Sequence, residues 1–402
     1  MTVITPTNAG VHYNFNEMHD AIQKYIEDEL LAGAISVVLK NNEVVDLKMW
    51  GHMDIESQRP MEEDAIFRIY SNTKIITSVA ALCLWEDGCF ELDDPIEKYL
   101  PELANLQVLK PGATEVSDTE PLKSKPTVRQ LMCHNAGFSY GIFLESPVDK
   151  LYTDQGILSP ESTLEHMTKQ LAGIPLAYQP GTRWQYSVST DILARLIEVW
   201  SGNTFYDCLN NRIFTPLGMK DTHFHVTPDK HHRLASNYAP VNLLDPMESG
   251  LKLAPDQLLG SYLEPKPFHS GGGGLTSTIS DYTRFFQMLI GKGTIGGVRI
   301  LKESTVTMMH SNQLPDGIAV QLPNWLMPDT LFGLGVAIKT APAKGEPEHA
   351  VDEYHWGGLA GTHSWIAPRA DLSGLIFTQR LPGFWHPFSH DFKRHVYQAA
   401  AD

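Results

Sequence analysis

The first apolar residues of the chain recur with the spacing of a helix. Between about residues 16 and 31 they fall at intervals of three and four: Met18, Ile22, Tyr25, Ile26 and Leu30. Positions three and four apart share one face of a helix, so this stretch predicts an amphipathic helix, which Gly33 is placed to end. Two β-branched, apolar runs follow at residues 35–39 and 44–50, and the Asn pair at 41–42 suits a tight turn between them. The chain is therefore predicted to open with a helix and a β-hairpin.

The strand pattern returns near the C-terminus. Short apolar runs, separated by Gly, Pro and Asp, predict strands at residues 332–338, 354–356, 363–367 and 373–378, and a last helix from about 388 to 400. Consecutive strands have little helix between them. This favours an antiparallel sheet over repeated strand–helix–strand units.

The middle of the chain is dominated by helical patterns, for example at residues 128–133, 162–171 and 190–200. We therefore predict an α+β fold in which an antiparallel sheet, flanked by helices, is built from both termini. Residues 1–94 and 268–402 would form this sheet domain, and residues 95–267 a mostly helical inserted domain, with the active site at the interface. The glycine run at 271–274 predicts a close approach of backbone segments, because no phosphate-binding pattern surrounds it.

The charge and composition of the chain restrict the classes of binding partner that we expect. The 402 residues include 31 basic and 47 acidic side chains, a net charge of −16, which repels phosphate backbones and anionic membrane surfaces. No run of 18 or more apolar residues and no basic, apolar leader is present, and the four cysteines form no CxxC pair. We expect a cytoplasmic protein with reduced thiols that binds neither nucleic acid nor membrane.

One short segment carries the main chemical signal. Ser71 opens a strongly apolar helical run that continues to Trp85, and Lys74 follows three residues later on the same helix face. A desolvated ammonium at the positive end of a helix gives up its proton more readily than an exposed one, and the neutral amine can accept the serine proton. The same helix end favours the alkoxide that forms. Ser71 is therefore the candidate nucleophile and Lys74 its candidate base.

The S-x-x-K spacing is weak evidence by itself, because about one or two matches per chain of this length arise by chance. A second match, at Ser249 and Lys252, lies between two prolines with Gly250 inside it, so a buried helix is not expected there. An N-cap residue is the structural alternative for Ser71.

Further motifs in a fixed order strengthen the catalytic interpretation. They are Ser71-Asn72-Thr73-Lys74, Gly88 to Ile96, Tyr99-Leu100-Pro101, Thr127 to Gly137, Pro180-Gly181-Thr182, Tyr186-Ser187, Gly271 to Thr278, and His355-Trp356-Gly357-Gly358. This order resembles the class C β-lactamase-like serine hydrolase superfamily, whose fold is the β-lactamase/transpeptidase type. It is most similar to the family VIII carboxylesterases and the lovastatin-type acyltransferase.

The resemblance implies roles for individual residues. Tyr186 matches the tyrosine that shares the base role with the lysine. The backbone N–H groups of Ser71 and Gly358 match the oxyanion hole. His355, Trp356 and Gly357 take the place of the K-T-G strand motif and would contact substrate. Phe138 is a candidate for the wall of the acyl pocket, although a core aromatic explains it equally well.

Two departures from the family pattern bear on the substrate. The tyrosine motif of lactam-cleaving relatives is often Y-x-N, and here Val188 stands in the third position. His355 replaces the lysine of K-T-G, and an imidazole is at most partly charged near neutral pH, so it anchors a carboxylate weakly. Both departures favour neutral esters over anionic lactams.

Other candidate sites are less specific. Gly137-Phe138-Ser139-Tyr140-Gly141 matches the G-x-S-x-G nucleophile elbow, but that elbow needs a strand before the serine, and a helical pattern precedes Ser139. Four histidines (His223, His225, His231 and His232) lack the spacing of a metal site, and we expect them in a solvated loop.

We therefore predict a serine carboxylesterase that hydrolyses small to medium neutral esters through an acyl-enzyme on Ser71. We expect it to need no metal and no cofactor. The alternatives are a β-lactamase or D-amino-acid peptidase-like amide hydrolase, a transferase that passes the acyl group to an alcohol, and a binding protein on the same fold without catalysis.

Overall fold

An eight-stranded antiparallel sheet forms the centre of the computed structural model, which describes residues 13–143, 146–254, 260–322 and 325–400. In spatial order the strands are β14 (Thr330–Phe332), β15 (Ala337–Lys339), β16 (Tyr354–Gly357), β17 (Thr362–Ala367), β18 (Leu372–Thr378), β1 (Gly33–Lys40), β2 (Glu43–Asp54) and β3 (Arg59–Pro60). Strands from both ends of the chain thus share one sheet, as predicted.

The two ends of the chain meet at the centre of this sheet. Strand β1 pairs with β18 on one side, with Ile35 opposite Phe377, and with β2 on the other. The turn between β1 and β2 places Asn41 and Asn42 at φ values of 52° and 64°. Asparagine tolerates this left-handed backbone better than most residues, which explains the pair at this turn.

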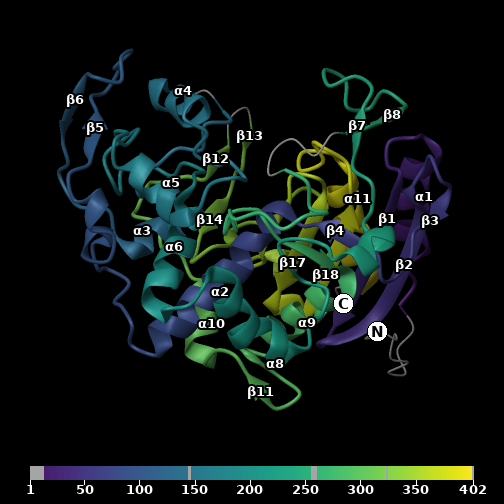
Figure 1. The fold of residues 1–402 in the computed structure, drawn as a ribbon. Helices are drawn as coiled ribbons and strands as arrows, with labels where there is room; N and C mark the ends of the chain where they lie inside the picture. Colours follow the sequence, from purple (N-terminus) through teal and green to yellow (C-terminus); the bar gives the residue numbers. More distant parts are fainter. Residues whose placement is uncertain (1–12, 144–145, 255–259, 323–324, 401–402) are drawn as a thin grey trace.

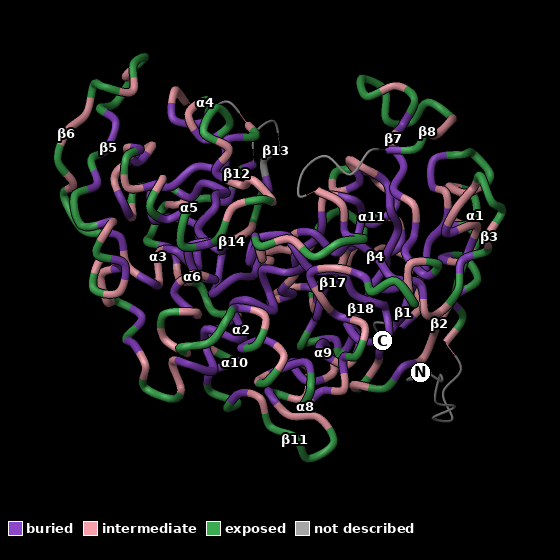
Figure 2. Tube along the Cα trace, in the orientation of Figure 1, coloured by how far each residue is buried: buried purple, intermediate pink, exposed green. Residues whose placement is uncertain are grey.

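Both faces of the sheet are buried, and alternate residues serve different faces. On one face Val38 and Ile376 pack with apolar side chains of α1 (Asn16–Glu27) and α11 (Phe388–Ala400). On the other face Val37 and Phe377 join the large core that includes α2 (Thr73–Glu86) and α9 (Ile279–Ile290). Figure 2 shows the central strands and α2 mainly in purple, whereas β2 and β3 at one edge of the sheet include pink and green positions, and exposed green segments lie at the loop tips.

A mostly helical segment packs beside the sheet, and Figure 1 shows most of it on the side away from the two termini. Its helices are α3 (Val128–Met132), α4 (Pro147–Asp154), α5 (Leu164–Leu171), α6 (Ser189–Ser201), α7 (Phe205–Leu209) and α8 (Thr215–Leu217). The remaining α-helix is α10 (Glu303–Met309). The structure also describes five smaller sheets with two strands each: β4 (Ile66–Arg68) with β9 (Thr276–Thr278), β5 (Gln107–Leu109) with β6 (Thr119–Pro121), β7 (Tyr238–Pro240) with β8 (Leu251–Leu253), β10 (Thr294–Ile295) with β11 (Val298–Arg299), and β12 (Gln321–Leu322) with β13 (Trp325–Leu326).

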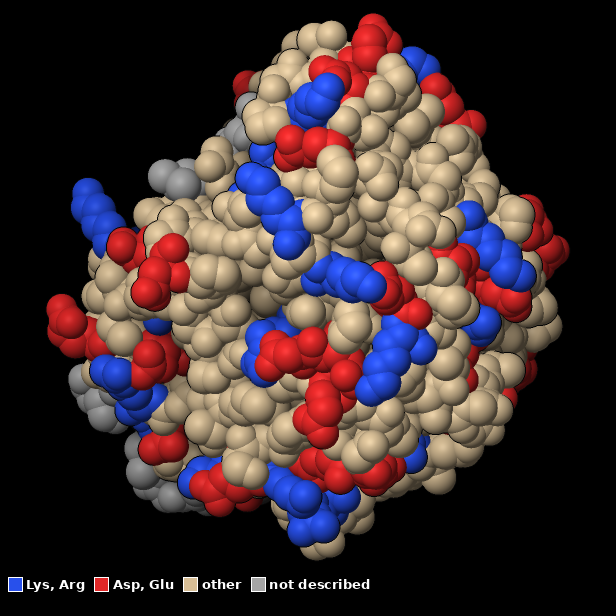
Figure 3. Space-filling view, turned by 90° about the vertical axis from the view of Figure 1, so that its left-hand side faces the viewer, with Lys and Arg blue, Asp and Glu red and all other residues tan. Residues whose placement is uncertain are grey.

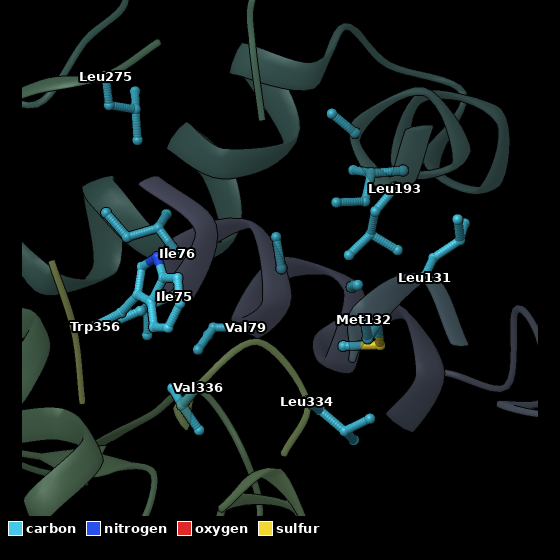
Figure 4. Close-up of a cluster of buried hydrophobic side chains, with 14 of the residues drawn as sticks. Ile75, Ile76, Val79, Leu131, Met132, Leu193, Leu275, Leu334, Val336 and Trp356 are labelled. Carbon is cyan, nitrogen blue, oxygen red and sulfur yellow. The ribbon is translucent and has the colours of Figure 1, made fainter. Parts of the chain in front are cut away.

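Helix α2 is the central buried element. All residues from 73 to 84 are buried, so this helix has no solvent face over most of its length. Figure 4 shows Ile75, Ile76 and Val79 of α2 among side chains from several other elements, which include Leu131, Leu193, Val336 and Trp356. A helix that is apolar all round is stable only in such an enclosed position.

One predicted strand is wrong. Residues 332–338 form parts of two strands, β14 and β15, with a tight turn at 333–336. Gly335 has a φ of +89°, and a Cβ on it would lie 2.0 Å from the Ser78 Oγ of α2. The turn exists because its backbone must pass against the buried helix, and glycine allows both the conformation and the approach.

The glycine run at 271–274 provides the close approach that the sequence predicts. A Cβ on Gly271 would lie 2.6 Å from the Thr190 carbonyl oxygen, and one on Gly274 would lie 2.9 Å from the Phe224 ring. Gly271 therefore passes between α6 and α2, where its close neighbours include Ala194 and Thr77, with no room for a side chain.

The surface carries charges of both signs. On the face drawn in Figure 3, blue and red side chains alternate, and no continuous basic area is visible there. None of the helices in the described part of the chain combines the length and the apolarity needed to span a membrane.

Because both ends of the chain share one sheet, we expect substitutions at its centre to lower the stability of the whole fold. Phe377 of β18 is fully buried and contacts the rings of Phe67 and Tyr282, so Phe377→Ala should lower the free energy of unfolding by about 3–5 kcal/mol through lost contacts and a cavity. Urea unfolding measures this change. Leu244→Ala, at a side chain that is 96% exposed, is the control and should change stability by less than about 0.5 kcal/mol. Equal effects of the two substitutions would contradict a common core for the two ends of the chain.

Candidate active site

Ser71 lies at the entrance to the buried helix. It belongs to a 3₁₀ turn, Tyr70–Asn72, that leads directly into α2, and the preceding Tyr70 has a φ of +41°. Ser71 is partly exposed, whereas Tyr70 and Asn72 on either side of it are buried. The fold therefore presents this hydroxyl at the start of α2, where the N–H groups of the helix give a positive potential.

Two side chains contact the Ser71 hydroxyl. Lys74 Nζ lies 3.2 Å from Ser71 Oγ, and the Tyr186 hydroxyl lies 2.7 Å from it. Lys74 comes from the first turn of α2, and Tyr186 from the segment that enters α6, so residues 112 positions apart in sequence meet at one oxygen. The fold thus places Lys74 and Tyr186, both predicted from the sequence, within hydrogen-bonding distance of Ser71 Oγ.

Lys74 is 1% exposed, and mainly uncharged groups surround its ammonium. Its Nζ donates to the Gly272 carbonyl oxygen at 2.6 Å and lies over the rings of Tyr186 (4.5 Å) and Tyr140 (5.3 Å). Those two rings are stacked with their centroids 5.2 Å apart. Burial raises the pKa of Tyr140 well above its ordinary value, so this ring is a neutral wall of the site.

Trp356 of β16 points into the site. Its indole Nε1–H donates to the Tyr186 hydroxyl oxygen at 3.2 Å, and the side chain is 2% exposed. A donor aimed at a phenol oxygen stabilises negative charge that develops there. The tryptophan that replaces the small residue of the K-T-G motif therefore contacts the candidate base directly.

A small apolar pocket opens over Ser71. Its water-accessible volume is about 60 Å³. The sheet side supplies Tyr70, Gly273, Leu322, Trp356, Gly357, Leu359, Phe384 and Trp385, and the helical side Tyr140, Ile142, Phe143, Leu158 and Tyr186. Such a pocket accepts a small uncharged group, and none of its described lining residues is charged.

Gly358, the predicted oxyanion donor, already uses its N–H in another hydrogen bond. Its N–H donates to the Thr362 carbonyl oxygen at 2.6 Å, within the turn from β16 to β17, and a Cβ on Gly358 would lie 2.4 Å from the Ile69 carbonyl oxygen. The next residue, Leu359, lines the pocket, and its N–H has no hydrogen-bond partner within the described part of the chain. Leu359 therefore replaces Gly358 as the candidate partner of the Ser71 N–H.

Two further predicted substrate contacts lie elsewhere. Because side chains alternate along β16, His355 points away from Trp356. It lines an adjoining cavity of about 220 Å³ toward α11, which shares Trp356, Gly357 and Phe384 with the pocket over Ser71. Burial holds the pKa of His355 well below its ordinary value, so its imidazole is neutral. Phe138 is 1% exposed and packs in the core of the helical segment, outside the lining of the pocket. Gly357 does line it, as expected.

The rival serines have other roles. Ser139 is 1% exposed, donates to the Asp149 carboxylate and accepts from Gln185 Nε2 at 2.8 Å, so its hydroxyl holds the loop before α4. Ser249 is exposed on the loop between β7 and β8, far from any helix start.

The histidine group differs from the solvated loop that we expected. His223 packs on the Tyr206 ring, with centroids 4.0 Å apart, and burial lowers its pKa to about 4. Within the residues that the structure describes, no group of three or more His, Cys, Asp or Glu side chains is arranged to hold a metal ion.

Comparisons with known proteins agree with this architecture. Residues 18–397 match the sequence profile of the family described as Beta-lactamase. An uncharacterized protein of Mycobacterium tuberculosis is 32% identical over 380 residues, which are 92% of this chain and 91% of that protein. Esterase EstB of Burkholderia gladioli is 30% identical over 370 residues, 88% of this chain and 87% of EstB. The LovD6 mutant of Simvastatin Synthase from Aspergillus terreus has a similar structure, with a TM-score of 0.80, 25% identity, and coverage of 96% of this chain and 93% of that one.

The family match spans nearly the whole chain, and the resemblance seen in the sequence motifs is confirmed. The protein belongs to the Beta-lactamase family and has its α+β fold.

Proposed function

We propose that this protein is a serine carboxylesterase that hydrolyses neutral esters with short acyl groups through an acyl-enzyme on Ser71. The observation that carries the proposal is the pair of contacts on Ser71 Oγ, from Lys74 at 3.2 Å and from Tyr186 at 2.7 Å, at the base of an apolar pocket. The similarity to EstB, which is named an esterase, supports it.

The proposed reaction starts when Ser71 Oγ attacks the ester carbonyl carbon. A bond forms between Oγ and that carbon, the carbonyl electron pair moves to its oxygen, and the single serine proton passes to the proton-transfer unit that Lys74 and Tyr186 form together. The N–H groups of Ser71 and Leu359 stabilise the oxyanion. The carbon–oxygen bond to the alcohol then breaks as the alcohol takes up the proton, and water repeats the sequence on the acyl-enzyme.

The walls of the pocket support the choice of substrate. A volume of about 60 Å³ holds roughly four water-sized positions, which suits a short acyl chain. Among the described residues, no charged side chain lines the pocket to pair with the carboxylate of a penicillin. Val188, which is fully buried, offers no side-chain amide at the third position of the tyrosine motif. These features favour neutral esters over lactams.

Acyl transfer to an alcohol is the second candidate. The similarity to a protein named Monacolin J acid methylbutanoyltransferase, 27% identical over 354 residues, favours it. The same acyl-enzyme serves both reactions, and only the acceptor differs. Product analysis with a short acyl ester, in the presence and absence of an added alcohol, separates hydrolysis from transfer.

The first prediction concerns the nucleophile. Ser71→Ala should abolish ester hydrolysis and labelling by a fluorophosphonate probe, because loss of a nucleophile costs several orders of magnitude in kcat. Ser139→Ala should keep both, although it removes a buried hydrogen bond and so lowers stability. Mass spectrometry of the labelled peptide checks the assignment. Hydrolysis by Ser71→Ala within about tenfold of the parent would refute the role of Ser71.

The second prediction concerns acyl length. The kcat/KM for acetyl and butyryl aryl esters should exceed that for an octanoyl ester, and should far exceed that for a penicillin or cephalosporin. Phe143→Ala enlarges the pocket and should shift the preference toward longer chains by about tenfold, whereas Leu244→Ala on the remote β7–β8 loop should not. A lactam kcat/KM equal to that for the butyryl ester would contradict the assignment.

The third prediction concerns Lys74 and Tyr186 as one proton-transfer unit. Their contacts with the same oxygen mean that removing either should cost about as much as removing both. Lys74→Ala, Tyr186→Phe and the double variant are compared for kcat/KM on one ester. Two large single losses whose product equals the double loss would show independent roles instead.

A further inference from the structure

Asp191 is a buried carboxylate beside the candidate active site. It lies in the first turn of α6, five residues after Tyr186, and has no exposed surface. Its Oδ1 accepts from Ser270 Oγ at 2.6 Å and from the Gly272 N–H at 3.0 Å. Its Oδ2 has no hydrogen-bond partner among the described residues. A buried carboxylate with a free oxygen is unstable unless a positive charge compensates it.

Lys74 is that positive charge. No carboxylate lies within ion-pairing distance of its Nζ in the described structure, yet the ammonium is almost fully buried. Burial raises the pKa of Asp191, and the charge of Lys74 opposes this effect. The other titratable groups that face Lys74 are Tyr140, Tyr186 and His134, and burial keeps the pKa of His134 well below its ordinary value. Asp191 is therefore the acidic group that balances this ammonium.

Gly272 joins the two charges. Its N–H donates to Asp191 Oδ1, and its carbonyl oxygen accepts from Lys74 Nζ at 2.6 Å. A Cβ on this residue would lie 2.6 Å from Asp191 Oδ2, so only glycine fits between the carboxylate and the backbone. Thr77 Oγ1 donates to the neighbouring Gly271 carbonyl oxygen at 2.8 Å and holds the run against α2.

We propose that Asp191 is a positioning residue for Lys74, which it holds through the backbone of Gly272 and supplies with a balancing negative charge. The inference rests on the proposed proton-transfer unit of Lys74 and Tyr186. When Ser71 attacks, its single proton passes to this unit, which then carries one more positive charge in a buried site. A carboxylate two hydrogen bonds away stabilises that charge, which no solvent can reach.

The test measures Ser71 reactivity without reference to the natural substrate. A fluorophosphonate probe forms a Ser71 Oγ–phosphorus bond as the phosphorus–fluorine bond breaks and fluoride leaves. The single serine proton passes to the unit formed by Lys74 and Tyr186. Asp191→Asn keeps the shape and the acceptor oxygen but removes the charge. The labelling rate at pH 7 should fall about 10- to 100-fold. The acidic limb of its pH profile should move to lower pH, because a base without a neighbouring anion binds its proton less tightly.

Asp281→Asn is the matched control. Asp281 is also buried and also accepts from one backbone N–H and one hydroxyl, those of Asp221 and Thr222, but it lies at the start of α9. Its substitution should lower stability and leave both the labelling rate and the pH profile unchanged. A purely structural role for Asp191 predicts the same pattern for Asp191→Asn, and that result would overturn the proposal.

Ser270→Ala supplies a second measurement if Asp191→Asn does not fold. It removes one hydrogen bond that keeps Asp191 ionised, so part of the carboxylate charge is lost, and the acidic limb should move in the same direction as in Asp191→Asn, to lower pH. An unchanged limb in Ser270→Ala contradicts the proposal. Absence of labelling in the parent protein would instead refute the proposed function, so the two failures are distinguishable.

Discussion

The rest of the site depends on the burial of Lys74 at the start of α2. An ammonium that is 1% exposed loses most of its hydration, and the surrounding structure must replace it. The neighbouring Ser71 hydroxyl supplies one replacement. The others come from distant parts of the chain: the Gly272 carbonyl oxygen and the faces of Tyr140 and Tyr186. Any change that moves α2, the glycine run or α6 relative to the others therefore also changes the chemistry of Ser71.

This constraint explains the arrangement of the fold around one helix. The sheet supplies Trp356 and the turn after β16, and the helical segment supplies Tyr186 and Tyr140. Neither part holds a complete site. The tight contacts of the glycine run, in which a Cβ would lie within 3 Å of neighbouring atoms, fix how closely the two parts approach. Close packing at this junction makes the geometry of the three candidate residues reproducible.

The same packing makes the pocket apolar and small. Aromatic and aliphatic side chains form its lining because they also complete the core at the junction, as Tyr186 and Trp356 do. The charged groups of β16 and its neighbours gather on the opposite face, where Glu353 binds Lys339 and Lys393. The sheet thereby keeps those charges away from the pocket.

The sequence by itself determined the local elements and the Ser71–Lys74 pair. The Asn41–Asn42 turn, the helix at 388–400 and the three-residue spacing of Ser71 and Lys74 are local, because propensity and periodicity act over a few residues. Motif order also identified the family and Tyr186. The domain boundaries at residues 95 and 267 stay a prediction.

Only the tertiary structure decided which groups surround the nucleophile. The hydrogen bond from the Gly358 N–H to the Thr362 carbonyl oxygen depends on the turn between two paired strands. The same turn makes Leu359 the candidate second donor to the oxyanion. The alternation along β16 sent Trp356 into the pocket and His355 away from it, and one residue of register reverses that choice. Asp191 carries no motif of its own, because its contacts to Gly272 and Ser270 join residues about 80 positions apart. Such contacts follow from packing, which a single sequence does not display.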